Sequence, residues 1–152
     1  MAKIIISDTS SLIALTKIDK LELLKELYQE IIITTAVYQE FGGPLPEWIL
    51  VTDVADRQKQ QELEGRLDKG EASSIALALE TDNSVLIIDE IKGRKIARSL
   101  NIEIIGTIGI ILLADKKGLT SDVVGTILRL VNNGFRLSDD LINKIIERYG
   151  RK

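Results

Sequence analysis

Short, almost uninterrupted apolar runs recur along this chain, and each is followed by a segment with helical spacing. The runs are IIIS (4–7), EIIIT (30–34), SVLIID (84–89) and IEIIG (102–106). A strand of this kind is buried on both faces, which is typical of parallel sheets covered by helices. A further segment, 49–54, is expected to form a short edge strand. The pattern therefore predicts an α/β fold with a mostly parallel sheet of four or five strands.

Segments with helical spacing separate these strands and close the chain. A polar segment, 55–69, is expected to be a solvated helix, and 70–80 a compact helix with an apolar face that begins at Gly70. The other predicted helices are 8–18, 21–28, 35–41, 91–100, 107–118, about 120–133 and 138–149. No repeat or linker interrupts the alternation, so residues 1–150 are expected to form one domain.

The composition excludes several classes of chemistry. The chain has no His and no Cys, which rules out Ser-His-Asp and Cys-His catalysis and zinc sites built on these residues. Chemistry must use carboxylates, hydroxyls, Lys and Arg, and carboxylate ligands suit Mg²⁺ or Mn²⁺. No apolar run approaches the roughly 20 residues of a membrane span, and no signal peptide is recognisable, so a cytoplasmic protein is expected.

Four acidic residues follow predicted strands or lie on the helices after them: Asp8, Glu40, Glu71 and Asp89. Taken singly, each has a simpler explanation, as a helix cap, a first-turn acid or an exposed helical residue. Taken together, they should converge, because the carboxyl ends of parallel strands, where the following helices begin, lie at one edge of the sheet. Crowded carboxylates need a cation, so the set predicts a divalent metal site suited to phosphodiester hydrolysis.

Polar and basic residues accompany these acids. Ser10 is expected to support the Asp8 carboxylate, and Lys92 and Arg94 lie on the helix directly after Asp89. Two interpretations of this helix stay open: its basic face is solvated, or its basic side chains bind the phosphate backbone of a substrate. Thr107, which opens a helix after Gly106, is expected either to cap that helix or to contact a ligand.

The ordered motifs resemble those of PIN-domain nucleases over nearly the whole chain. The matching segments are IIISDTSSLIAL, TAVYQEF, GEASSIALA and VLIIDEIKGRKIA, followed by IIGTIGIILLADKKG. The resemblance implies a three-layer α/β/α Rossmann-like fold and a Mg²⁺- or Mn²⁺-dependent ribonuclease. It also implies that Asp8, Glu40, Glu71 and Asp89 form the catalytic, metal-binding quartet, with Ser10 as its supporting hydroxyl.

Many small proteins that this chain resembles are toxins of toxin–antitoxin pairs, which implies RNA as substrate, an antitoxin-like partner and often a homodimer. Two features depart from the family pattern: Glu71 stands where Asp is more usual, and Ile87 and Ile88 replace polar residues. They leave an alternative open, a catalytically silent PIN-like module that binds a protein or RNA. Helix 108–114 and the C-terminal helix pair are compatible with either a dimer interface or an ordinary core.

Overall fold

The protein is built around a central sheet with five parallel strands, in the order β3-β2-β1-β4-β5. The structure, a computed structural model, describes residues 2–150. The strands are Ile4–Ser7 (β1), Ile31–Thr34 (β2), Ile49–Thr52 (β3), Ser84–Ile87 (β4) and Glu103–Ile105 (β5). The predicted α/β fold is confirmed, and the sheet in this part of the chain is wholly parallel rather than mostly so.

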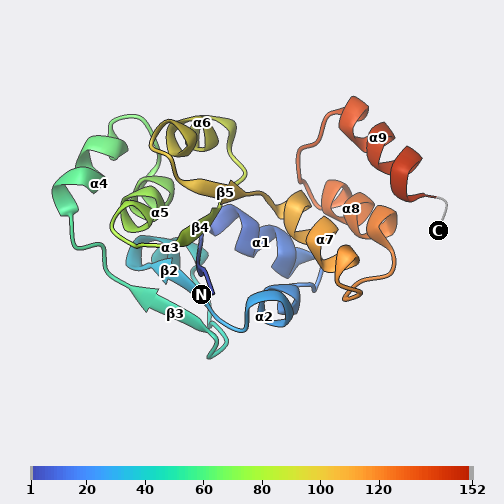
Figure 1. Cartoon of the computed structure of the whole chain (residues 1–152), viewed down its shortest axis with the longest axis horizontal. Helices are drawn as coiled ribbons and strands as arrows, with labels where there is room; N and C mark the ends of the chain where they lie inside the picture. The colour runs from blue at the N-terminus through green and yellow to red at the C-terminus, as the bar shows by residue number, and fades with distance from the viewer. Residues whose placement is uncertain (1, 151–152) are drawn as a thin grey trace.

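Nine helices of the described chain surround the sheet (Figure 1). They are Thr9–Lys17 (α1), Glu22–Tyr28 (α2), Thr35–Phe41 (α3), Arg57–Glu64 (α4), Lys69–Leu79 (α5), Ile91–Ser99 (α6), Thr107–Lys116 (α7), Val123–Asn132 (α8) and Asp139–Tyr149 (α9). The polar segment 55–69 differs from the prediction, because its helix ends at Glu64 and Gly65 follows as the C-cap. Helix α5 begins at Lys69, one residue earlier than expected, since Asp68 rather than Lys69 is its N-cap.

The two faces of the sheet pack against different helices, as alternate side chains of each strand point to opposite faces. On one face Ile6 and Leu86 pack with α4, α5 and α6, through residues such as Ile75. On the other face Ile5 packs with α1, α2 and α7, through residues such as Leu12. This arrangement is the three-layer α/β/α fold that the sequence predicts.

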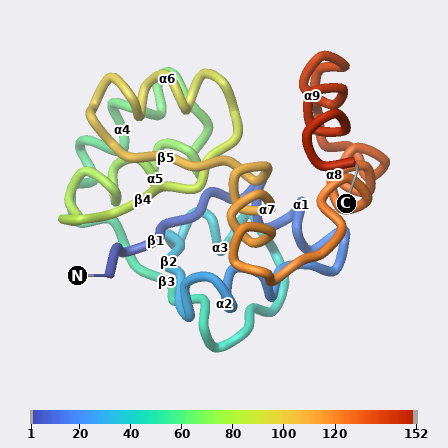
Figure 2. The backbone as a smooth tube through the Cα atoms, turned by 45° about the vertical axis from the view of Figure 1, so that its right-hand side comes forward, coloured from blue at the N-terminus to red at the C-terminus, as the bar shows by residue number. Residues whose placement is uncertain are grey.

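The C-terminal helices α8 and α9 form an extension outside these layers. Figure 2 shows them beyond α1 and α7, away from the sheet. Their buried residues Ile127 and Ile145 pack against Ile18, the C-cap of α1, and Ile111 of α7 in a third apolar cluster. The inward residues of α7 and of the C-terminal pair are thus explained by a core within the chain. Among residues 2–150, no helix combines the length and the apolar character that a membrane crossing requires.

The strand order places a topological switch point between β1 and β4. From β1 the chain moves outward to β2 and β3, then returns to the other side of β1 with β4 and β5. In such sheets a crevice opens at the carboxyl ends of the two central strands, and ligands bind there. Asp8 follows β1 and Asp89 follows β4, so both lie at this edge.

Candidate metal and active site

Asp8 lies at the switch point, with its carboxylate buried. It directly follows β1, and its backbone N–H donates to the carbonyl oxygen of Ile87, the last residue of β4, at 3.0 Å. It occupies the N-cap position of α1, yet its side chain makes no capping hydrogen bond. Only 2% of Asp8 is exposed. Helix capping therefore does not explain this residue, and its burial points to another role.

Glu40 and Glu71 approach Asp8 from α3 and α5. The Thr9 hydroxyl, next to Asp8, donates to Glu40 Oε1 at 2.6 Å. A Cβ atom on Gly70 would lie 2.1 Å from the same oxygen, so the absence of a side chain lets α5 pack this close to α3. Glu71 follows in the first turn of α5 and is 6% exposed. The sequence segments around these three acids therefore meet at one point.

A fourth acid in this group, Asp68, was not predicted as a site residue. Its side chain accepts a hydrogen bond from the Glu71 backbone N–H at 2.8 Å, and Glu71 Oε1 accepts from the Asp68 backbone N–H at 3.4 Å. Together these bonds form a capping box at the start of α5. The spacing Asp-x-x-Glu before an apolar helix is the usual signal for this motif, so the sequence did contain it.

The electrostatics of the group show uncompensated negative charge. The pKa of Asp8 is raised from 3.8 to about 7, mainly by burial and then by the charges of Glu71, Asp68 and Glu40, against a lowering by the Thr9 backbone N–H. Burial, followed by the charge of Asp68, raises the pKa of Glu71 from 4.5 to about 7. The two ion pairs found within residues 2–150 lie elsewhere, at Lys3–Glu103 and Lys59–Glu62. No basic side chain of the described residues therefore pairs with these acids.

Asp89 has a separate environment. It is not the cap of α6, because Glu90 accepts the hydrogen bond from the Lys92 backbone N–H at 3.0 Å. Its carboxylate accepts from both the backbone N–H and the hydroxyl of Thr107, at 2.7 and 2.6 Å. The hydroxyls of Thr107 and Ser11 are hydrogen-bonded to each other at 2.8 Å. Asp89 is thus anchored to the start of α7 and, through Ser11, to α1.

This arrangement changes the predicted role of Thr107. The residue is fully buried, with 0% exposure, so a substrate cannot reach it in this structure. Its two hydrogen bonds to Asp89 instead make it a positioning residue for that carboxylate. The sequence left helix capping and ligand contact open as roles for Thr107. The structure shows a third arrangement, in which the Asp89 carboxylate accepts from the backbone N–H of Thr107, the first residue of α7.

The predicted quartet is therefore divided. Asp8, Glu40 and Glu71 form one group with Asp68, whereas Asp89 is not among the charges that raise the pKa of Asp8. Within residues 2–150, no three acidic residues approach closely enough to bind one ion together. Mg²⁺ usually keeps several waters and binds through only one or two carboxylates. The buried carboxylates of Asp8 and Glu71, which pair with no basic side chain of the described residues, fit that kind of ligation.

The predicted substrate-binding residues lie on the Asp89 side. Ser10 is exposed and lines, together with Asp89, a cavity of about 310 Å³. No hydrogen bond from Ser10 to Asp8 is present in the described structure, so Ser10 does not support that carboxylate as predicted. Arg94 is half-buried and donates from Nη1 to the Ile88 carbonyl at 2.8 Å. Lys92 is exposed on the same helix.

Gly106 explains how Arg94 and Asp89 share so small a space. A Cβ atom at this position would lie 2.9 Å from both Arg94 Nη1 and Asp89 Oδ1. Any residue larger than glycine would therefore displace one of these groups. The glycine–threonine turn noted in the sequence thus serves the site twice: Gly106 leaves room for Asp89 and Arg94, and Thr107 holds Asp89.

Comparison with known proteins identifies the family. The profile of the PIN domain matches residues 4–151. No curated protein and no solved structure matches the chain significantly. PIN domains are generally nucleases, and they typically use divalent metal ions. The acids at the switch point and the parallel sheet agree with this match. Because the profile covers almost the full length, this chain belongs to the PIN-domain family.

Proposed function

We propose that this chain is a Mg²⁺- or Mn²⁺-dependent endoribonuclease that hydrolyses RNA phosphodiester bonds. The observation that supports it best is the buried Asp8 carboxylate, surrounded by Glu71, Asp68 and Glu40 without a basic partner in the described chain. Mutual repulsion makes such a group unfavourable at neutral pH unless protons or a cation neutralise it. A chain without His or Cys also has few other means of activating water.

Asp8 and Glu71 are the residues that would hold the ion. When bound, a divalent cation supplies a more acidic water molecule and stabilises charge on the phosphate. Without it, each of these carboxyl groups has a pKa of about 7 and is partly protonated at neutral pH. Glu40, oriented by the Thr9 hydroxyl, and Asp89, held by Thr107, flank the pair and complete the catalytic set in this proposal.

Residues around Asp89 would bind the substrate backbone. Arg94 and Lys92 supply positive charge from α6, and Ser10 supplies a hydroxyl at the rim of the adjoining cavity. Lys17 and Arg136 line the same cavity, so basic side chains approach Asp89 from several elements. Phosphate contacts of this kind position a nucleic acid without reading its sequence.

A ribonuclease assay with matched variants tests the proposal. Wild-type protein with Mn²⁺ should cleave RNA, EDTA should stop cleavage, and Asp8→Asn should abolish it. Asp122→Asn is the control, because Asp122 is the exposed N-cap of α8, and Asn caps helices as well as Asp. Equal cleavage by wild type and Asp8→Asn would reject the site.

The alternative, a catalytically silent module, gives a different result. Such a module would show neither cleavage nor site-specific Mn²⁺ binding in a calorimetric titration. The two departures from the family pattern, Glu71 in place of Asp and Ile87 and Ile88 in place of polar residues, are the observations that favour it. Mn²⁺ binding that Asp8→Asn eliminates would contradict this alternative.

The proposal extends to a cytoplasmic toxin of a toxin–antitoxin pair, with an antitoxin-like protein as partner and a homodimer as the assembly. Its support is the resemblance of the chain's ordered motifs to those of PIN-domain toxins, together with the match of the PIN profile to residues 4–151. Expression of the wild type should arrest growth, whereas Asp8→Asn should not. Equal growth with both proteins would contradict the toxin role, and light scattering would establish the oligomeric state.

A further inference from the structure

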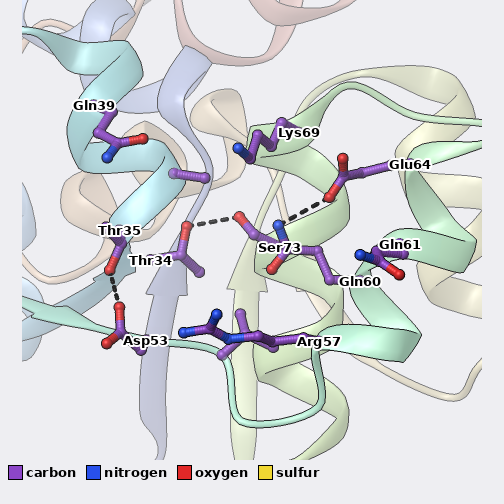
Figure 3. A pocket seen from close by; sticks show the side chains of 12 residues that line it. Thr34, Thr35, Gln39, Asp53, Arg57, Gln60, Gln61, Glu64, Lys69 and Ser73 are labelled. Carbon is purple, nitrogen blue, oxygen red and sulfur yellow. Dashed lines mark hydrogen bonds between the residues drawn. The ribbon is translucent and has the colours of Figure 1, made fainter.

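A second, separate cavity of about 370 Å³ lies beside the acidic group, between α3, α4 and α5. Figure 3 shows Gln39, Arg57 and Lys69 around this space, one from each of the three helices. Its size is at the lower end of the range for small-ligand pockets. Its lining is mostly polar, with amides, hydroxyls and charged groups, which suits a ligand that makes several hydrogen bonds.

Helix α4 presents an unusual face to this cavity. Its lining residues are Arg57, Gln60, Gln61 and Glu64, with the spacing i, i+3, i+4 and i+7. That spacing defines the stripe that a surface helix normally fills with apolar residues against the protein body. Leu63 is the one buried residue of α4. Arg57, Gln61 and Glu64 are exposed and Gln60 is half-buried, so this face of α4 is open to solvent and accessible to a polar ligand.

The acidic and basic side chains that line the cavity differ in whether they have hydrogen-bond partners. Its two acids have partners within the chain: Asp53 accepts a hydrogen bond from the Thr35 hydroxyl, and Glu64 accepts one from the Gln60 amide at 3.0 Å. Its two cations, Arg57 and Lys69, take part in no ion pair or side-chain hydrogen bond within residues 2–150. The lining carries two negative and two positive charges, and the two exposed cations are available to bind an anionic group of a ligand.

The cavity adjoins the candidate active site through two shared helices. On α3, Gln39 lines the cavity and the next residue, Glu40, belongs to the acidic group. On α5, Lys69 lines the cavity and Glu71 belongs to the acidic group. A polymer whose scissile phosphate lies at the acids would therefore extend into this cavity with a neighbouring unit.

We infer that the cavity holds one nucleotide of a single-stranded RNA, adjacent to the bond that is cleaved. Lys69 and Arg57 bind its phosphate, and the amides of Gln39 and Gln61 hydrogen-bond the edge of its base. This inference deepens the proposed ribonuclease function and rests on it for the position of the cut. It assigns sequence preference to a cavity that Arg94 does not line.

RNA binding without cleavage tests the inference directly. All proteins carry Asp8→Asn and are titrated in EDTA against fluorescent oligo(A), oligo(C), oligo(G) and oligo(U), with anisotropy as the signal. Lys69→Ala and Arg57→Ala should each weaken all four complexes roughly five- to tenfold and reduce the salt dependence by about one counterion. Gln61→Ala should weaken the preferred oligonucleotide roughly tenfold and the others much less.

Two matched controls lie outside the cavity. Arg66→Ala removes a nearby exposed cation, and Gln58→Ala removes an exposed amide of α4 that points away from the cavity lining. Both should leave affinity and base preference unchanged. If Lys69→Ala and Gln61→Ala behave like these controls, within roughly twofold, the inference is overturned. A nucleoside monophosphate that binds as tightly as the oligonucleotides would also overturn it, in favour of a small-molecule site.

The outcome is separable from that of the ribonuclease proposal. Mn²⁺-dependent cleavage by the wild type, combined with normal RNA binding by the cavity variants, removes only the cavity inference. Loss of binding in those variants, combined with no cleavage under any metal condition, removes the nuclease proposal and leaves the nucleotide site in place.

Discussion

Replacing Asp8 by Asn should stabilise the metal-free protein at neutral to alkaline pH. The Asp8 carboxyl is 2% exposed, and burial together with Glu71, Asp68 and Glu40 raises its pKa from 3.8 to about 7. Because the pKa in the folded state exceeds that in the unfolded state, the folded protein holds an extra proton between these values. Its contribution to stability is complete below pH 3.8 and is lost as the pH rises to about 7.

The size of the effect follows from this window. Each pH unit corresponds to about 1.4 kcal/mol, so the whole rise in pKa amounts to roughly 4 kcal/mol. About 2–3 kcal/mol of this falls between pH 5 and pH 8. Asn carries no charge at any pH, so the variant should gain this amount relative to the wild type across that range. Charges elsewhere in the protein affect both proteins alike and cancel in the comparison.

Urea unfolding in EDTA at pH 5 and pH 8 measures the difference. The single tryptophan, Trp48, is partly buried against the apolar cluster that contains Ile5 and Leu12, and it reports on unfolding by fluorescence. Asp122→Asn makes the same chemical change at an exposed helix cap and should show no pH-dependent gain. Adding Mn²⁺ should stabilise the wild type and not Asp8→Asn, by linkage. If Asp8→Asn gains nothing relative to the wild type between pH 5 and pH 8, the buried acidic site is wrong.

Three further predictions concern the residues around this site. The affinity for Mn²⁺ should rise roughly a hundredfold between pH 6 and pH 8, because Asp8 and Glu71, each with a pKa of about 7, must both lose protons to bind it. Calorimetry in buffers of different ionisation enthalpy measures the proton release, and a pH-independent affinity would contradict the assignment. Gly70→Ala should leave stability unchanged or raise it by about 0.5–1 kcal/mol, since alanine favours helices, while lowering cleavage. The reason is that the new Cβ would lie 2.1 Å from Glu40 Oε1 and displace that carboxylate; full cleavage activity would show that Glu40 is dispensable. Thr107→Val should cost about 1–3 kcal/mol in urea unfolding and reduce cleavage, because it removes the hydroxyl bonded to Asp89 and Ser11, whereas Thr107→Ser should retain both. Equal stability of the two Thr107 variants would contradict the positioning role.

The secondary structure was largely predictable because its signals are local. Continuous apolar runs such as 85–88 are typical of strands buried on both faces, and all five predicted strands are present. The prediction of one helix over 55–69 was wrong because the polar composition continues past the end of that helix. Gly65 after the polar helix and Asp68 three residues before Glu71 mark the end of one helix and the start of the next.

The sequence predicted where in the fold the candidate site lies, but it did not predict which of the acids lie close to one another. A parallel sheet brings the residues after β1 and β4 to one edge, so Asp8 and Asp89 could be placed there from the alternation alone. The pairing of Asp89 with Thr107 joins residues 18 positions apart on different elements. Neither residue type nor spacing distinguishes that bond from a ligand contact, so the sequence left both roles of Thr107 open.

By itself, the sequence determined the fold class, the exclusion of His and Cys chemistry, and the presence of several acids at the carboxyl edge of the sheet. Only the tertiary structure decided which acids share an environment, that Thr107 is enclosed, and that α3, α4 and α5 surround a polar cavity. Two cations line that cavity, and neither pairs with a side chain of residues 2–150. The physical reason is the distance along the chain over which each property is determined. Helix and strand preferences depend on neighbours within a few residues, whereas the pKa of Asp8 depends on burial by segments that are remote in the chain.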